Sequence, residues 1–261
     1  QAMNEQTNRP LILVTNDDGI EAKGIRHLAS CMAPLGRVIV VAPDRAQSGM
    51  GHAVTINDVL KMEERSFPLE GIEQAWQTTG TPVDCVKLAI YEILGQKPDL
   101  LVSGINHGSN ASINVIYSGT MSAAVEGAVE GIPSIGFSLL DHSAQADFSA
   151  TSSYITRIAS QVLEKGLPAG TCLNVNFPKL PADSIKGMRV CRQSAGHWDD
   201  AFDKRTSPSG STYYWMTGNF NNPDQGEDTD EWALRNGFVS IVPTQFDLTA
   251  QIGLGQDRKS T

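Results

Sequence analysis

Two adjacent carboxylates, Asp17 and Asp18, end a short apolar run and could together hold a divalent cation. Neighbouring carboxylates repel one another unless a cation compensates their charge. Their oxygens are hard ligands of the kind that Mg²⁺, Mn²⁺ and Ca²⁺ prefer. An ordinary alternative is a turn in which Asp18 caps the following helix. The dipeptide alone does not separate the two interpretations.

Neutral oxygen-bearing side chains follow two further apolar runs along the chain. Ser48 lies in the segment 43–52, and Asn106 lies in the segment 104–110. Because ligands of open α/β sheets bind outside the carboxyl ends of the strands, these side chains would meet Asp17 and Asp18 if the strands are neighbours. Few protein ligands and several waters is the usual arrangement around Mg²⁺. Ser48 and Asn106 therefore favour the metal interpretation.

The run Tyr117–Thr120 precedes a predicted helix and is typical of an anion cradle. Backbone N–H groups at a helix start point outward, and the helix dipole favours negative charge there. Ser118 and Thr120 would add hydroxyl donors. The alternative is that either hydroxyl is an ordinary helix cap. The turn Thr79–Pro82 is similar, and it could line the same crevice or only begin the next helix.

Two histidines and two glutamates complete the candidate residues. His52 and His107 lie in the predicted site loops and could donate to a phosphate or act as an acid, although a single histidine is more often structural. Glu126 and Glu130 are four residues apart on a predicted helix, which favours a solvated face. A metal beside a phosphate cradle indicates hydrolytic phosphoryl transfer, in which a carboxylate accepts the proton of the attacking water.

Several other hydrolytic classes lack their motifs in this chain. Haloacid-dehalogenase phosphatases need Asp-x-Asp, whereas these aspartates are adjacent. Zinc-dependent deacetylases with His-Pro-Asp-Asp need a histidine ahead of the carboxylates, where this chain has Asn16. Neither a Gly-x-x-x-x-Gly-Lys-[Ser/Thr] loop nor a Gly-x-Ser-x-Gly elbow occurs, which excludes a P-loop NTPase and a serine-elbow hydrolase.

Alternating strands and helices must position these residues. Apolar β-branched runs predict strands at 11–15, 37–42, 99–103, 134–139 and 171–176. Helical patterns predict helices at 21–34, 83–94, 120–130 and 152–164. Strands that are apolar on both faces and alternate with helices indicate a doubly wound α/β fold with a mostly parallel sheet.

The chain changes character after Pro178, where Gly, Pro, Asn, Asp and aromatic residues surround short strand-like pieces. This segment is predicted to be a β-rich extension that makes subunit contacts, or alternatively a lobe that closes over the site. The expected division is a tag or disordered segment at 1–10, a catalytic core at 11–180 and the extension at 181–261. Gln1 and Ala2 precede Met3, which is expected to be the native start.

Composition restricts the partners and the compartment. The 261 residues include 20 Lys and Arg against 29 Asp and Glu, a net charge of −9, which argues against a nucleic-acid polymer as partner. No apolar run approaches the roughly 20 residues of a membrane span. The cysteines form no C-x-x-C pair and are expected to be buried free thiols of a reducing, cytoplasmic compartment; they are Cys31, Cys85, Cys172 and Cys191.

Taken together, five ordered motifs resemble those of the survival protein SurE family. They are Leu13–Ile20, Val41–Gly49, Gly80–Val86, Ser103–Asn110 and Ile116–Thr120, with a further match at Gly237–Thr249. The resemblance implies a Rossmann-like core and a divalent-metal-dependent phosphatase, a nucleotidase of nucleoside 5′- and 3′-monophosphates. Some members of the family also cleave short polyphosphate. The resemblance also implies a homodimer or homotetramer, because the C-terminal part of the family mediates both by swapping.

The resemblance assigns roles to particular residues. The metal ligands of the family fall on Asp17, Asp18, Ser48 and Asn106, and one Mg²⁺ or Mn²⁺ per subunit is expected. The phosphate-binding residues fall on Asn110, Ser118, Gly119 and Thr120. Asp17 is the predicted general base, with Asp18 as the alternative. Two other functions remain open, a nucleotide-binding or sensing module without turnover and a scaffold whose C-terminal segment is the functional part.

Overall fold

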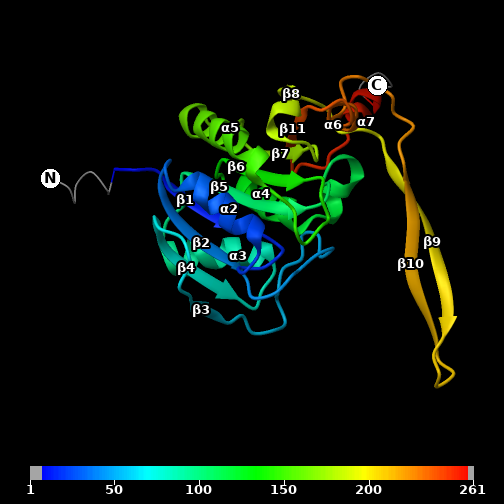
Figure 1. The fold of residues 1–261 in the computed structure, drawn as a ribbon, viewed down its shortest axis with the longest axis horizontal. Helices are drawn as coiled ribbons and strands as arrows, with labels where there is room; N and C mark the ends of the chain where they lie inside the picture. Colours follow the sequence, from blue (N-terminus) through cyan, green and yellow to red (C-terminus); the bar gives the residue numbers. More distant parts are fainter. Residues whose placement is uncertain (1–7, 258–261) are drawn as a thin grey trace.

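The fold is built on one nine-stranded sheet, seen in Figure 1, in a computed structural model that describes residues 8–257. Residues 1–7, the greater part of the predicted tag, lie outside the described residues. In order across the sheet, the strands are β3 (Met62–Glu64), β4 (Ile72–Thr78), β2 (Arg37–Pro43), β1 (Leu11–Thr15), β5 (Leu100–His107), β6 (Ser134–Leu139), β7 (Thr171–Phe177), β11 (Val239–Gln245) and β8 (Met188–Val190).

The central strands of this sheet are parallel, as the sequence predicts. Strands β4, β2, β1, β5, β6 and β7 run in one direction, whereas β3 pairs antiparallel with β4 and β11 pairs antiparallel with β7. The predicted fold class is confirmed. Strand β4 escaped prediction because its residues Glu73, Gln74 and Gln77 interrupt any apolar run.

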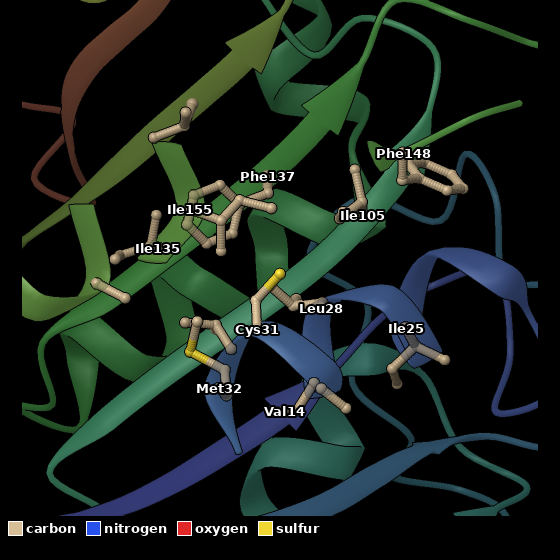
Figure 2. Packing of buried hydrophobic residues seen from close by; sticks show 14 of the residues in the cluster. Val14, Ile25, Leu28, Cys31, Met32, Ile105, Ile135, Phe137, Phe148 and Ile155 are labelled. Atoms are coloured by element: carbon tan, nitrogen blue, oxygen red, sulfur yellow. The ribbon is translucent and has the colours of Figure 1, made fainter. Parts of the chain in front are cut away.

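Helices cover both faces of the sheet. Successive residues of a strand point to opposite faces, and Ile12 and Val14 of β1 belong to one apolar cluster while Leu11 and Leu13 belong to another. The helices α2 (Lys23–Met32) and α5 (Ser152–Lys165) pack on the first cluster, part of which Figure 2 shows. The second cluster lies beneath α3 (Pro82–Leu88), its π-helical continuation η1 (Ala89–Leu94) and α4 (Gly119–Val129).

The strand order reverses at β1. From β1 the chain first builds outward through β2 and β4, and it then returns to add β5 on the other side of β1. The carboxyl ends of β1 and β5 are therefore neighbours at a topological switch point, where open α/β sheets bind their ligands. Asp17 and Asp18 follow β1, and Asn106 is the next-to-last residue of β5.

The C-terminal part of the chain contributes to the main sheet and also leaves it. Strands β8 and β11 complete one edge, with the short helix α6 (Asp230–Arg235) between β10 and β11. Strands β9 (His197–Thr206) and β10 (Thr212–Asn221) form a separate two-stranded hairpin, which projects far from the sheet in Figure 1. Large apolar side chains on this hairpin are exposed, among them Phe202, Tyr214 and Trp215.

The remaining elements are short. They are the 3₁₀ helices η2 (Ser112–Tyr117), η3 (Ser149–Thr151) and η4 (Ala182–Ser184) and the terminal helix α7 (Gln251–Asp257). The prediction of buried cysteines is confirmed, because all four are buried free thiols. Within residues 8–257, none of the helices has the length and apolar character needed to span a bilayer.

Candidate functional site

The strand ends and the start of α4 enclose a cavity of about 240 Å³. Its lining includes six of the eight residues predicted for the site, which are Asp17, Asp18, Ser48, Asn106, Asn110 and Ser118. A larger cavity of about 420 Å³ beside Asp141 and Lys179 contains none of the predicted residues. The structure thus brings together predicted site residues that are as much as 101 positions apart, from Asp17 to Ser118.

Asp17 is held rigidly at the end of β1. Its side chain is only 4% exposed, and Thr120 donates its hydroxyl hydrogen to Asp17 Oδ1 over 2.6 Å. The backbone N–H of Gln47 donates to the Asp17 carbonyl oxygen over 2.7 Å, which ties the loop of Ser48 to the aspartate. Burial, followed by the charge of neighbouring Asp18, raises the pKa of Asp17 to about 6.

Asp18 presents a buried oxygen that lacks a donor. Its Oδ2 atom has no hydrogen-bond partner among residues 8–257, and burial raises the pKa of this carboxyl group although nearby His107 opposes the shift. In the same part of the chain, no Lys or Arg forms an ion pair with Asp17 or Asp18. A buried carboxylate oxygen without a donor is costly, and a cation placed beside it would remove that cost.

The helix-cap alternative for Asp18 is wrong. The turn after β1 is made by Asn16, whose Nδ2 donates to the Gly19 carbonyl oxygen over 2.8 Å and whose Oδ1 accepts from the Gly19 N–H over 3.2 Å. Helix α2 begins later, after Ala22, and has no side-chain cap. Asn16 makes the turn, so both aspartates can face the cavity.

Asn106 and Ser48 add oxygen atoms that could bind a hard metal ion beside the two aspartates. Asn106 Nδ2 donates to the carbonyl oxygens of His107 and Gly108 over 3.3 and 3.1 Å, which leaves Asn106 Oδ1 as the amide atom available to a cation. Together with Ser48, the lining offers two carboxylates, an amide and a hydroxyl. In the described part of the chain, no group of three or more His, Cys, Asp or Glu side chains is arranged for a metal. The donors suit Mg²⁺ or Mn²⁺ better than zinc.

The predicted phosphate cradle divides into two layers. Ser118 lines the cavity and also caps α4, accepting from the Met121 N–H over 3.0 Å, so both interpretations of this residue apply. Gly119 and Thr120 are not part of the lining, because they pack behind Asp17. Asn110 is fixed from the sheet side, where its Nδ2 donates to Ser138 Oγ over 2.7 Å.

The solvated face predicted at Glu126 is wrong. Glu126 is 4% exposed because α4 packs against both the sheet and α3. Its carboxylate pairs with His52 Nε2 at 2.8 Å and with Lys87 Nζ at 2.6 Å. His52 is therefore engaged away from the cavity lining, whereas His107 belongs to it.

The turn Thr79–Pro82 does not belong to the cavity, whereas three further residues do. Thr81 caps α3 through a capping box and takes no part in the cavity lining, so the turn Thr79–Pro82 begins a helix. Asn114 and His142 line the cavity although the sequence did not point to them, and so does Tyr117, the first residue of the predicted cradle, to which no role was assigned. Membership of the run Tyr117–Thr120 was the signal for Tyr117, whereas the loop of His142 carried none.

Comparisons with known proteins identify the family. The family model described as "Survival protein SurE" matches residues 12–200. A protein of Christiangramia forsetii named "5'-nucleotidase SurE" is 62% identical over 93% of this chain and 93% of its own length. A protein of the same name from Flavobacterium psychrophilum is 60% identical over 93% of this chain and 94% of its own length.

A solved structure agrees with these relatives. The crystal structure of a SurE protein from Aquifex aeolicus superimposes with a TM-score of 0.81 at 39% identity, and the match covers 96% of this chain and 99% of that one. The match therefore includes both the sheet that carries the aspartates and the C-terminal elements. On the family model, the full-length relatives and the shared structure, this chain belongs to the SurE family.

Proposed function

We propose that this chain is a divalent-metal-dependent 5′-nucleotidase, a phosphoric monoester hydrolase that converts nucleoside monophosphates to nucleoside and phosphate. The relatives named 5′-nucleotidase match it over nearly their whole length, which supports the activity. The observation that carries the metal requirement is the adjacent pair of a buried carboxylate, Asp17, and a half-buried one, Asp18, whose Oδ2 atom is buried and reached by no donor of residues 8–257.

Asp17, Asp18, Ser48 and Asn106 hold the cation, one per subunit. When bound, a divalent cation such as Mg²⁺ or Mn²⁺ neutralises the phosphate, polarises its oxygens and makes a bound water more acidic. The residues lining the cavity include neither Lys nor Arg, so the side chains themselves offer little permanent positive charge to a phosphate. A chain of net charge −9 then depends on the cation to bind an anion.

The surrounding residues orient the phosphate and move the proton. Ser118 and Asn110 contact the phosphate oxygens, aided by the N–H groups at the start of α4, which the helix dipole makes favourable for an anion. Asp17 is the general base, with Asp18 as the alternative. The hydroxyl of Thr120 holds Asp17 Oδ1, so Asp17 Oδ2 accepts the proton of the attacking water.

Further properties of the family extend the proposal. The same cradle accepts 3′-monophosphates and short polyphosphate, because the contacts address the phosphate rather than the base. The core 11–180 carries the chemistry, and the extension 181–261 joins subunits into a homodimer or homotetramer through its exposed aromatic side chains. The buried thiols suit the cytoplasm.

Metal removal is the test of this function. Protein stripped with EDTA is expected to release phosphate from AMP or GMP at least about tenfold more slowly than the same protein after Mg²⁺ or Mn²⁺ is returned, because the phosphate then lacks its main counter-charge. Phosphate release is measured across nucleoside 5′- and 3′-monophosphates, sugar phosphates and polyphosphate with each metal. Tight nucleotide binding without turnover under every condition would instead identify a sensing module.

A further inference from the structure

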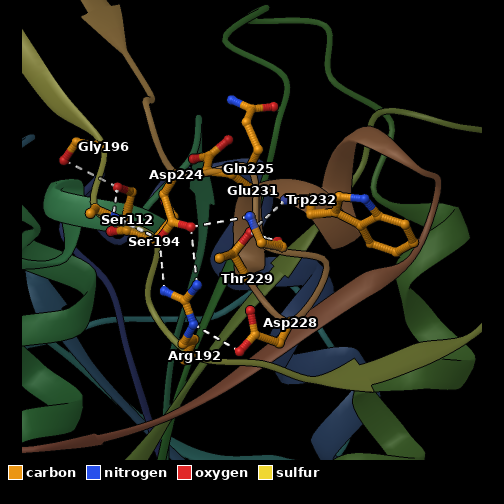
Figure 3. A network of polar contacts seen from close by, with 12 residues as sticks. Ser112, Arg192, Ser194, Gly196, Asp224, Gln225, Asp228, Thr229, Glu231 and Trp232 are labelled. Carbon is orange, nitrogen blue, oxygen red and sulfur yellow. Dashed lines mark hydrogen bonds and ion pairs between the residues drawn. The ribbon is translucent and has the colours of Figure 1, made fainter.

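The base of the β9–β10 hairpin is joined to the wall of the active-site cavity. We call this base the hairpin root and define it as Ser194, Gly196, Trp198 and Phe220. It contacts η2 (Ser112–Tyr117), the 3₁₀ helix that supplies Asn114 and Tyr117 to the cavity lining. Figure 3 shows the polar network around Ser112, Ser194 and Gly196.

A buried carboxylate, Asp230, makes the central link. Asp230 is 1% exposed, and its Oδ2 accepts the backbone N–H of Ser112 over 2.8 Å. Its Oδ1 accepts the N–H of Ser194 over 3.0 Å and that of Glu231 over 2.8 Å. A buried charge is expensive unless hydrogen bonds satisfy it, and here three backbone donors do so. Asp230 therefore joins the first residue of η2 to the hairpin root.

The backbone conformation of Ser112 is unusual and accompanies this contact. Its φ of 56° lies in the left-handed region, which residues other than glycine seldom adopt and which persists only where the surroundings enforce it. The hydroxyl of Ser112 also donates to the carbonyl oxygen of Ser194 over 3.0 Å. A side chain at Gly196 would place its Cβ 2.7 Å from Ser112 Oγ, so the close approach needs glycine there.

Trp198 makes a second and independent link. Its indole N–H donates to Asn114 Oδ1 over 2.8 Å, and its ring packs edge-on against Phe220 at 5.7 Å. Asn114 is one of the residues lining the cavity. The hairpin root thus holds η2 at its start, through Ser112, and in its middle, through Asn114.

The phosphate end of the cavity is held by other parts of the molecule. Asn110 is fixed by Asn176 and Ser138 of the sheet, Ser118 by the first turn of α4, and Asp17 by Thr120. Asp230 and Trp198 make no hydrogen bond to any of these residues. The phosphate end therefore has its own supports in the sheet and α4, although Ser118 directly follows η2 and its N–H donates to the Val115 carbonyl oxygen over 3.4 Å.

We propose that Asp230 and Trp198 are positioning residues, through which the hairpin root sets η2 as the wall that receives the nucleoside part of the substrate. This inference rests on the proposed nucleotidase function. The projecting hairpin would then affect substrate binding indirectly, through η2, because neither Asp230 nor Trp198 belongs to the cavity lining. Tyr117, which is 54% exposed at the end of η2, is the aromatic residue that this wall offers to a nucleoside.

The Asp230→Asn variant tests the central link. An asparagine at 230 keeps one acceptor oxygen, which is expected to stay with the two donors Ser194 and Glu231 and to turn the amide N–H₂ towards the Ser112 N–H. KM for AMP is then expected to rise about tenfold, since a hydrogen bond to a charged group is lost. Inhibition by inorganic phosphate and the metal requirement are expected to stay within about twofold of wild type, because the phosphate end is unchanged.

Two further variants keep the test decisive. Asp224→Asn removes the charge that pairs with Arg192 and leaves one acceptor oxygen for the N–H groups of Ala195 and Gly226. It changes the same network without reaching η2, so its KM for AMP is expected to match wild type. Trp198→Phe keeps the aromatic packing, removes only the donor to Asn114, and is expected to raise KM severalfold; it also decides the matter if Asp230→Asn fails to fold.

The outcomes are distinguishable from failure of the proposed function. Wild-type turnover is measured first, because its absence would overturn the nucleotidase assignment itself. Given turnover, the inference is overturned if KM is unchanged in both Asp230→Asn and Trp198→Phe. It is equally overturned if phosphate inhibition weakens by the same factor as KM, or if Asp224→Asn has the same effect, since either result would indicate general loosening.

Discussion

Replacing Asp17 by asparagine is expected to lower metal-dependent phosphate release from AMP by more than about 10³-fold, because one substitution removes both an anionic ligand and the proposed general base. Asparagine keeps the shape of the side chain and can still accept the hydroxyl of Thr120, so the packing at the end of β1 should persist. The rate is measured at saturating Mg²⁺ or Mn²⁺, so that a weaker metal affinity is separated from a slower chemical step.

The Asp17→Asn substitution is expected to lower activity but not the stability of the fold. Burial and Asp18 raise the pKa of Asp17 to about 6 in the folded chain, above its ordinary value of 3.8. Above pH 6 the folded state must therefore hold a charge that the unfolded chain carries more easily, and this opposes folding. Metal-free Asp17→Asn is expected to melt at or above the wild-type temperature at pH 7.5, which shows that lost activity does not reflect lost structure.

A matched control is Asp141→Asn. Asp141 lies just beyond the end of β6, pairs with Lys179 at 3.1 Å, and does not line the site cavity. Its activity is expected to stay within about twofold of wild type, because a partly exposed ion pair contributes little. If Asp17→Asn turned over AMP as fast as Asp141→Asn at saturating metal, Asp17 would be neither the base nor an essential ligand.

The sequence was sufficient for five of the nine strands of the sheet and for six of the eight predicted site residues in the cavity lining. Buried parallel strands are continuous apolar runs, so β1, β2, β5, β6 and β7 could be found without tertiary information. Once these strands are parallel, their polar ends must meet, and Ser48 and Asn106 follow from the same rule as Asp17. Strand β4 could not be found, since its polar residues carry no such signal.

The supports behind the cavity could not be predicted, because they depend on which surfaces the fold covers. Glu126 shares its spacing with exposed helical glutamates, and only the packing of α4 makes it a buried partner of His52 and Lys87. Thr120 belongs to a motif typical of phosphate contact, yet its hydroxyl donates to Asp17. Asp230 is 118 positions from Ser112, and no local pattern links the two.

A methyl group added behind Asp17 is expected to disable the site without touching any polar group. A Cβ at position 119 would lie 2.7 Å from Asp17 Cβ and 2.9 Å from Asp17 Oδ2, which is closer than van der Waals contact. Asp17 cannot yield easily, because it is buried and its Oδ1 is held by Thr120. Gly119→Ala should therefore displace the carboxylate and lower kcat/KM for AMP about 10²-fold, as misplacements near 1 Å can.

The helix itself has no reason to suffer from this change. Gly119 is the first residue of α4 and is not among the glycines with positive φ, so alanine fits the backbone and favours the helix. Melting temperature and oligomeric state should match wild type within error. A large fall in melting temperature together with the activity would indicate that the methyl group disturbs α4 rather than the aspartate.

A double-mutant cycle shows whether Gly119→Ala acts by displacing the Asp17 carboxylate or by disturbing the start of α4. If the methyl group acts only by moving the Asp17 carboxylate, adding Gly119→Ala to Asp17→Asn should lower the residual activity by less than about threefold, because the carboxylate it displaces is already absent. If it acts on Ser118 or on the start of α4, the full loss of about 10²-fold should appear again in the Asp17→Asn background. The first outcome would place the function of Gly119 in one role, which is to let a buried carboxylate lie against the first turn of a helix.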